Sequence, residues 1–120
     1  MNKEEEFLDL IADLIQRDVI VIVEGKKDAT ALKKLGINNI VELTKKPLYA
    51  IVEEVSENNK ECSILTDLDK KGKELYGKLN TNLRKHGVKV NDKPRNFLFK
   101  HTKLRQIEGL THYLEKIKTD

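Results

Sequence analysis

Along the chain, segments with apolar residues at helical spacing alternate with short segments that are predicted to be strands. Residues 4–16 place apolar side chains three and four positions apart, which predicts an amphipathic helix. Five consecutive β-branched residues follow, from Val19 to Val23. Such a run does not suit a half-exposed strand, so it predicts a central parallel strand that is buried on both sides. This strand stops at Glu24-Gly25.

The same alternation continues toward the C-terminus. Helical spacing returns in four further segments, and three further short segments are predicted to be strands. The helices are expected at residues 27–35, 47–55, 72–85 and 103–118, and the strands at residues 37–43, 62–66 and 87–90. Strands that alternate with helices of this length indicate an α/β fold, in which a four-stranded, mainly parallel sheet carries helices on both faces. We expect a single domain over residues 1–120.

Three carboxylates follow the ends of two predicted strands. Right-handed crossovers place the carboxyl ends of parallel strands at one edge of the sheet, where ligands of open α/β sheets bind. Glu24 follows one strand and Asp67 another, so residues that are far apart in sequence are expected to meet at this edge. Asp69 points the same way as Asp67 on an extended segment. Carboxylate oxygens suit Mg²⁺ or Mn²⁺, although a solvated turn that caps the next helix would also explain the Asp-x-Asp pair.

Composition limits the class of protein. A chain of 120 residues with 38% hydrophobic content is long enough for one domain with a buried core. The single cysteine, Cys62, excludes an intrachain disulfide framework and a Cys-rich zinc site. No run approaches the roughly 20 apolar residues that a membrane span needs, and the acidic N-terminus is unlike a signal peptide. We therefore expect a soluble, cytoplasmic protein that does not bind membranes.

The positive charge is mild overall, but it is concentrated near the candidate acids. A net charge of +3 does not by itself indicate a nucleic-acid-binding protein. Lys26, Lys27, Lys70 and Lys71 nevertheless follow closely on the acidic positions, where they could anchor phosphates. Solvated helix faces explain these lysines equally well. The apolar run at residues 97–99 offers a similar choice between stacking on bases and packing in the core, and core packing is the commoner outcome.

Three other interpretations of the Asp-x-Asp segment are disfavoured by spacing or position. An EF-hand loop that began at Asp67 would need oxygen ligands at positions 71 and 78, and both are lysines. A haloacid-dehalogenase-type phosphatase normally carries this motif on its first strand, whereas two predicted strands precede it here. The glycine spacings of a phosphate-binding loop or a dinucleotide fingerprint are absent.

Two short motifs combine the candidate residues. The first is a strand followed by Glu-Gly-x-x-Asp and a helix. In it Glu24 lies at the rim of a buried strand, where its charge needs a cation or solvent, and Gly25 permits a tight exit. Asp28 lies near the N-terminus of the next helix, where a capping role would account for it equally well. The second motif is a strand followed by Asp-x-Asp-x-x-Gly, from Asp67 to Gly72.

Together and in this order, the two motifs resemble those of the Toprim family. Residues 19–29 match its first motif and residues 64–72 its second. The resemblance spans residues 18–92, a core that the helix at 4–16 and the helical segment at 103–118 flank. The chain looks like one of the small stand-alone Toprim proteins of archaea and bacteria, and it is similar to the Toprim part of primases and of nucleases that mature 5S ribosomal RNA. The resemblance implies a Rossmann-like three-layer sandwich.

The resemblance also implies a site and an activity. It assigns Glu24 as general acid or base, and it assigns Asp67, Asp69 and Glu24 to a site for Mg²⁺ or Mn²⁺. Supporting positions are Gly25, Asp28 and Gly72. The implied function is metal-dependent phosphodiester chemistry on RNA or DNA, by a nuclease (a hydrolase) or a phosphotransferase. The alternative is a non-catalytic module that binds metal and nucleic acid and acts with a protein partner in replication, repair or RNA processing.

Overall fold

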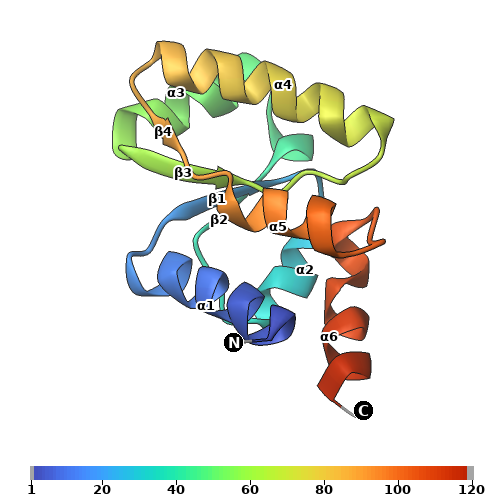
Figure 1. The fold of residues 1–120 in the computed structure, drawn as a ribbon. Coiled ribbons are helices and arrows are strands. Elements are labelled where there is room, and N and C mark those ends of the chain that lie inside the picture. Colours follow the sequence, from blue (N-terminus) through green and yellow to red (C-terminus); the bar gives the residue numbers. More distant parts are fainter. Residues whose placement is uncertain (1, 119–120) are drawn as a thin grey trace.

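A parallel sheet between two helical layers forms the molecule (Figure 1). The computed structural model describes the backbone of residues 2–118 and the side chains of residues 2–115. Its strands are β1 (Ile20–Val23), β2 (Ile40–Glu42), β3 (Glu61–Ile64) and β4 (Lys89–Val90), in the order β2-β1-β3-β4. Every neighbouring pair is parallel, so the carboxyl ends of the strands lie along one edge. The predicted α/β fold with its four-stranded parallel sheet is confirmed.

The helices divide between the two faces of the sheet (Figure 1). One face is covered by α1 (Lys3–Gln16), α2 (Lys26–Lys34), α5 (Lys93–His101) and α6 (Leu110–Lys118). The other face is covered by α3 (Leu48–Asn58) and α4 (Lys70–Lys85). Two short 3₁₀ helices, η1 (Leu43–Lys45) and η2 (Ile107–Gly109), complete the chain. None of the helices in the described part is long and apolar enough to cross a membrane.

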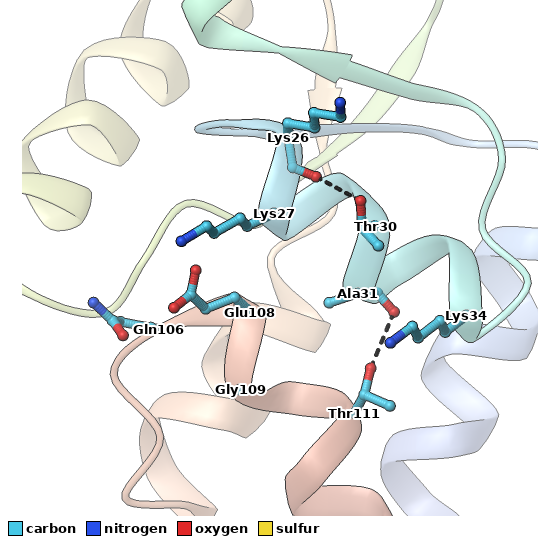
Figure 2. Close-up of a pocket in the computed structure, with 9 residues that line it drawn as sticks. All are labelled: Lys26, Lys27, Thr30, Ala31, Lys34, Gln106, Glu108, Gly109 and Thr111. Carbon is cyan, nitrogen blue, oxygen red and sulfur yellow. Dashed lines mark hydrogen bonds between the residues drawn. The ribbon is translucent and has the colours of Figure 1, made fainter.

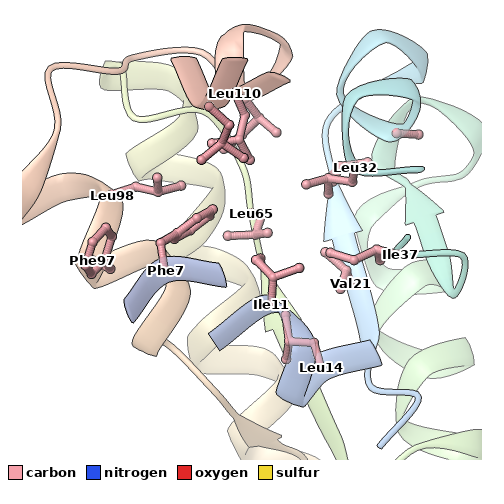
Figure 3. Close-up of a cluster of buried hydrophobic side chains, with 14 of the residues drawn as sticks. Phe7, Ile11, Leu14, Val21, Leu32, Ile37, Leu65, Phe97, Leu98 and Leu110 are labelled. Atoms are coloured by element: carbon pink, nitrogen blue, oxygen red, sulfur yellow. The ribbon is translucent and has the colours of Figure 1, made fainter. Parts of the chain in front are cut away.

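The β-branched run of β1 separates two hydrophobic clusters. Val21 and Val23 belong to the cluster beneath α1, α2 and α5, which Figure 3 shows in part. Ile22 belongs to the cluster beneath α3 and α4. All three side chains are fully buried, because successive residues of a strand point to opposite faces and both faces are covered. The expectation of a strand buried on both sides is therefore confirmed.

The C-terminal third differs from the sequence prediction in two places. Helix α5 was not predicted, because its apolar residues occur as one short run rather than at helical spacing. The helical segment expected from residue 103 begins instead at Ile107, since residues 102–106 have no helical structure. In this segment the carbonyl oxygen of Arg105 accepts a hydrogen bond from the N–H of Leu68, at 2.8 Å, which ties it to the loop after β3. Ile117, an apolar residue of the helix predicted at 103–118, lies outside the described side chains.

Candidate functional site

Glu24 and Asp67 meet at the carboxyl edge of the sheet. The last backbone hydrogen bond between β1 and β3 runs from the N–H of Leu65 to the carbonyl oxygen of Ile22, at 2.8 Å. Two residues further on, the N–H of Asp67 donates to the side chain of Glu24, whose Oε1 lies 3.0 Å from the amide nitrogen. The carbonyl oxygen of Glu24 is used elsewhere, by the N–H of Thr44 at 3.2 Å. The Glu24 carboxylate thus extends the pairing of the two strands, and the predicted proximity of these strand ends is confirmed.

The two aspartates also accept hydrogen bonds from the backbone. Asp67 Oδ1 accepts from the N–H of Ile107 at 2.8 Å. Asp69 Oδ1 accepts from the N–H of Gly72 at 2.8 Å and caps the N-terminus of α4. The capping role considered for the Asp-x-Asp segment is therefore present at Asp69. Among the side chains of residues 2–115 and the described backbone, nothing donates a hydrogen bond to the second oxygen of either aspartate or of Glu24.

The donor atoms at this edge suit a divalent cation, but they are not gathered into a cage. Among the described side chains, no group of three or more His, Cys, Asp or Glu residues is arranged to hold a metal ion. Mg²⁺ commonly binds through only one or two protein carboxylates and keeps several waters. The Glu24 carboxylate contacts the Asp67 backbone, and each of the two side chains keeps one oxygen, of the hard type that such ions prefer, without a hydrogen bond among the described residues. These residues therefore fit a hydrated divalent ion.

The electrostatic environment of Glu24 favours its protonated form. Partial burial raises the pKa of Glu24, and the negative charges of Asp67 and Asp69 raise it further. The hydrogen bond from the Asp67 amide and the charge of Lys71 act in the opposite direction. Desolvation is the main cause of this increase, and charge repulsion is the smaller one.

Asp28 is a second acidic residue, after Glu24, whose pKa is raised. Its carboxylate accepts the N–H of Gly25 at 3.2 Å and closes the first turn of α2. Only 7% of the residue is exposed, and burial, reinforced by the charge of Asp67, raises the pKa of Asp28 to about 6. The charges of Glu24 and Glu108 contribute to this increase, and the hydrogen bond from Gly25 opposes it. The edge therefore concentrates negative charge that a bound cation would neutralise.

Arg95 donates hydrogen bonds to the loop after β3 that carries Asp67, a role that the sequence did not predict. The residue comes from α5 and is 6% exposed. Its guanidinium donates to the carbonyl oxygen of Thr66, to the Thr66 hydroxyl at 2.9 Å and to the carbonyl oxygen of Asp67 at 2.9 Å. It also lies over the ring of Tyr76, 4.8 Å from the centroid. No signal in the sequence marks it, because α5 lies outside both motifs.

A second overlooked group is Glu42, which ends β2 at the same edge. It pairs with Val23 of β1, so it lies next to the strand that carries Glu24. One of its carboxylate oxygens is buried and has no hydrogen-bond partner in the described part of the chain. Its position at the end of a predicted strand is the signal that could have identified it.

Gly72 is required by a close approach between two backbone segments. A Cβ built on this residue would overlap the carbonyl oxygen of Asp67. The Thr66 hydroxyl also donates to the carbonyl oxygen of Gly72, at 2.8 Å. The start of α4 is therefore held directly against the loop that carries the two aspartates, and this contact explains the glycine in the second motif.

The candidate phosphate-binding lysines all lie at this edge, because α2 and α4 both begin there. All four are exposed, and within the described residues none forms an ion pair: Lys26, Lys27, Lys70 and Lys71. The first two line a cleft of about 470 Å³ between α2 and the C-terminal segment (Figure 2). Lys27 and Glu108 face each other across this cleft.

This fold and this arrangement of acids define a class of protein. A family model described as the Toprim domain matches residues 18–92, and the chain belongs to the Toprim family. Over 95% of its length the chain is 33% identical to a UPF0292 protein of Methanocaldococcus jannaschii, of which it covers 97%. Over 87% of its length it is 40% identical to a UPF0292 protein of Pyrococcus abyssi, of which it covers 78%.

Two solved structures resemble the chain. A putative protein from Aquifex aeolicus superposes with a TM-score of 0.78 and 30% identity, over 87% of this chain and 94% of that one. The zinc-binding and RNA polymerase domains of the Aquifex aeolicus primase superpose with a TM-score of 0.54 and 21% identity, over 88% of this chain and 27% of that one. The primase likeness concerns the fold alone.

Proposed function

We propose that this protein carries out metal-dependent phosphodiester chemistry on nucleic acid, as a nuclease or a phosphotransferase in the cytoplasm. The observation that carries the proposal is the contact between Glu24 and Asp67 at the carboxyl edge of a Toprim domain. It places a carboxylate of raised pKa against the backbone of Asp67, whose own carboxylate has an oxygen that accepts no hydrogen bond among the described residues. Exposed lysines surround this pair at the starts of α2 and α4.

Asp67, Asp69 and Glu24 would hold Mg²⁺ or Mn²⁺. The bound ion would neutralise charge on the phosphate and lower the pKa of a coordinated water. The hydrogen bonds from Ile107 and Gly72 fix one oxygen of each aspartate and leave the other for the cation. Arg95 holds the Asp67 backbone, so the carboxylate keeps its position when an anionic substrate arrives.

Glu24 would transfer the proton. Because its pKa is raised, the carboxyl group binds a proton more tightly than an ordinary glutamate does, which is the direction that suits a general acid or base. Lys26 and Lys27 would anchor phosphates on one side of the acids, and Lys70 and Lys71 on the other. Such contacts predict an affinity that falls as the salt concentration rises.

A cleavage screen tests the proposal. Single-stranded, duplex and hairpin forms of RNA and DNA are incubated with the protein in EDTA, Mg²⁺ or Mn²⁺. We expect metal-dependent turnover that Glu24→Gln lowers by roughly 10²- to 10⁴-fold, the usual contribution of a general acid or base. Glu57→Gln, at the exposed end of α3, is the matched control and should keep the wild-type rate. Turnover that survives Glu24→Gln would refute the role of Glu24.

The alternative is a non-catalytic module, in which Glu24, Asp67 and Asp69 bind metal and hold the loops together through the backbone hydrogen bond that each of them accepts. A module that binds metal and nucleic acid and works with a protein partner in replication, repair or RNA processing would need no proton transfer. Binding of nucleic acid without turnover in any metal would establish this alternative, and turnover abolished by Asp67→Asn would exclude it.

A further inference from the structure

Phe99 lies outside the hydrophobic core in which its sequence neighbours Phe97 and Leu98 are buried. Phe97 and Leu98 are 6% and 0% exposed, whereas Phe99 is 52% exposed. The ring of Phe97 packs between those of Phe7 and His101, with centroid distances of 5.4 and 4.9 Å. The core interpretation of the run at residues 97–99 therefore holds for two of its members, and the third presents an aromatic ring to solvent.

The exposed ring lies next to the acidic edge. Lys73 of α4 places its Nζ 4.8 Å from the centroid of the Phe99 ring. Lys73 also lines a hollow of about 610 Å³ whose walls include Asp69, Lys70 and Arg105. Asp69 and Lys73 are one turn apart along α4, which is about 6 Å. A nucleic-acid strand bound at Asp69 would therefore be close enough to reach Phe99.

The surface around Phe99 is basic. Residues 93–106 include five lysines and arginines and no aspartate or glutamate. Arg95 is buried, and the other four basic side chains are exposed: Lys93, Lys100, Lys103 and Arg105. A second hollow, of about 750 Å³, is lined by residues that include Lys100, Lys103 and His112. The acids that line the first hollow are Asp69 and Glu74.

We propose that Phe99 stacks against an unpaired base of single-stranded nucleic acid whose phosphates lie along Lys73, Arg105 and Lys103. The proposal rests on the proposed function, and it specifies that the site prefers single-stranded nucleic acid. Aromatic rings bind bases through their flat faces, which are accessible in a single strand and hidden in a duplex. Lys73 covers part of the ring and lies where it could pair with the phosphate next to the stacked base.

The test measures binding without turnover. Labelled single-stranded and duplex oligonucleotides, as DNA and RNA, are titrated in EDTA with the wild type, Phe99→Ala, Phe99→Tyr and Tyr49→Ala, and fluorescence anisotropy is recorded. Tyr49 is the matched control, because it is 74% exposed on α3, on the opposite face of the sheet. We expect Phe99→Ala to weaken single-strand binding by roughly 5- to 150-fold, the effect of removing one stacking aromatic. Phe99→Tyr and Tyr49→Ala should bind like the wild type.

The outcomes separate this inference from the function on which it rests. Equal affinity of Phe99→Ala and Tyr49→Ala for single strands would overturn the stacking role and leave the proposed function intact. An equal loss on duplex would also overturn it, because a duplex offers no free base face. If the wild type binds no oligonucleotide at all in EDTA, the stacking role is overturned, and the cleavage screen in Mg²⁺ and Mn²⁺ decides the proposed function separately. Thermal unfolding of each variant checks that a loss of binding is not a loss of fold.

Discussion

The close contact at Gly72 predicts that Gly72→Ala, which adds a single methyl group, destabilises the protein. The Cβ of alanine at this position would overlap the backbone of Asp67 rather than a flexible side chain, so a backbone segment must move. The hydrogen bond from the N–H of Gly72 to Asp69 and the bond from Thr66 to the Gly72 carbonyl would both be strained or lost. Loss of a cap costs about 1 kcal/mol, and an unsatisfied buried group costs about 1–3 kcal/mol.

The helix-forming preference of alanine offsets part of this loss. Replacing glycine inside a helix by alanine stabilises it by about 1 kcal/mol. Gly72→Ala should therefore lower the free energy of unfolding by a net 2 kcal/mol or so, the difference between these contributions. Gly77→Ala lies on the same helix, where a Cβ meets nothing within 4 Å. It should instead raise the free energy of unfolding by about 0.5–1 kcal/mol.

Urea denaturation followed by circular dichroism measures both variants, and nucleic-acid cleavage or binding measures the effect on the site. We expect the two substitutions to shift stability in opposite directions and only Gly72→Ala to impair the site, because only it displaces Asp67. If Gly72→Ala proves as stable as Gly77→Ala and leaves the site unimpaired, the close approach of α4 to the Asp67 loop is not what requires glycine.

Two further substitutions test the buried charges. Asp28 has a folded pKa of about 6 against an ordinary 3.8, so the folded state binds the proton more tightly and stability falls as pH rises through that interval. In EDTA, Asp28→Asn should gain at most about 3 kcal/mol at pH 7.5 and nothing at pH 3.5, measured by urea denaturation at each pH. Arg95→Met leaves the carbonyl oxygens of Thr66 and Asp67 unpaired, and it should lower the free energy of unfolding by about 2 kcal/mol or more. It should also speed hydrogen exchange at the amide of Leu68.

Each of these substitutions has a matched control. Asp9→Asn, on the exposed side of α1, provides the pH-independent baseline for Asp28→Asn. A gain for Asp28→Asn that is the same at every pH would mean that the charge of Asp28 is not its cause. Arg84→Met, on the exposed end of α4, is the control for Arg95→Met. Equal effects of the two arginine substitutions would show that Arg95 does not support the loop.

The sequence determined the sheet and the acids at its edge. The run from Val19 to Val23 consists of five β-branched residues and contains no polar one, which favours a strand with both faces covered and therefore a central place in the sheet. Parallel crossovers then put Glu24 and Asp67 at one edge whatever the details of the loops. The proximity of these two residues followed from topology, which is why it could be predicted over a long separation in sequence.

Tertiary structure alone decided how the edge is supported. Arg95 and the N–H of Ile107 reach the Asp67 loop from segments outside both motifs, and neither shows a pattern in its own neighbourhood. The start of the C-terminal helix was misplaced for the same reason. Arg105 pairs with Leu68 across the fold, and this long-range contact outweighs the local helical spacing. Local periodicity reports which residues an element buries, whereas the partners of polar groups are set by segments that only the folded chain brings together.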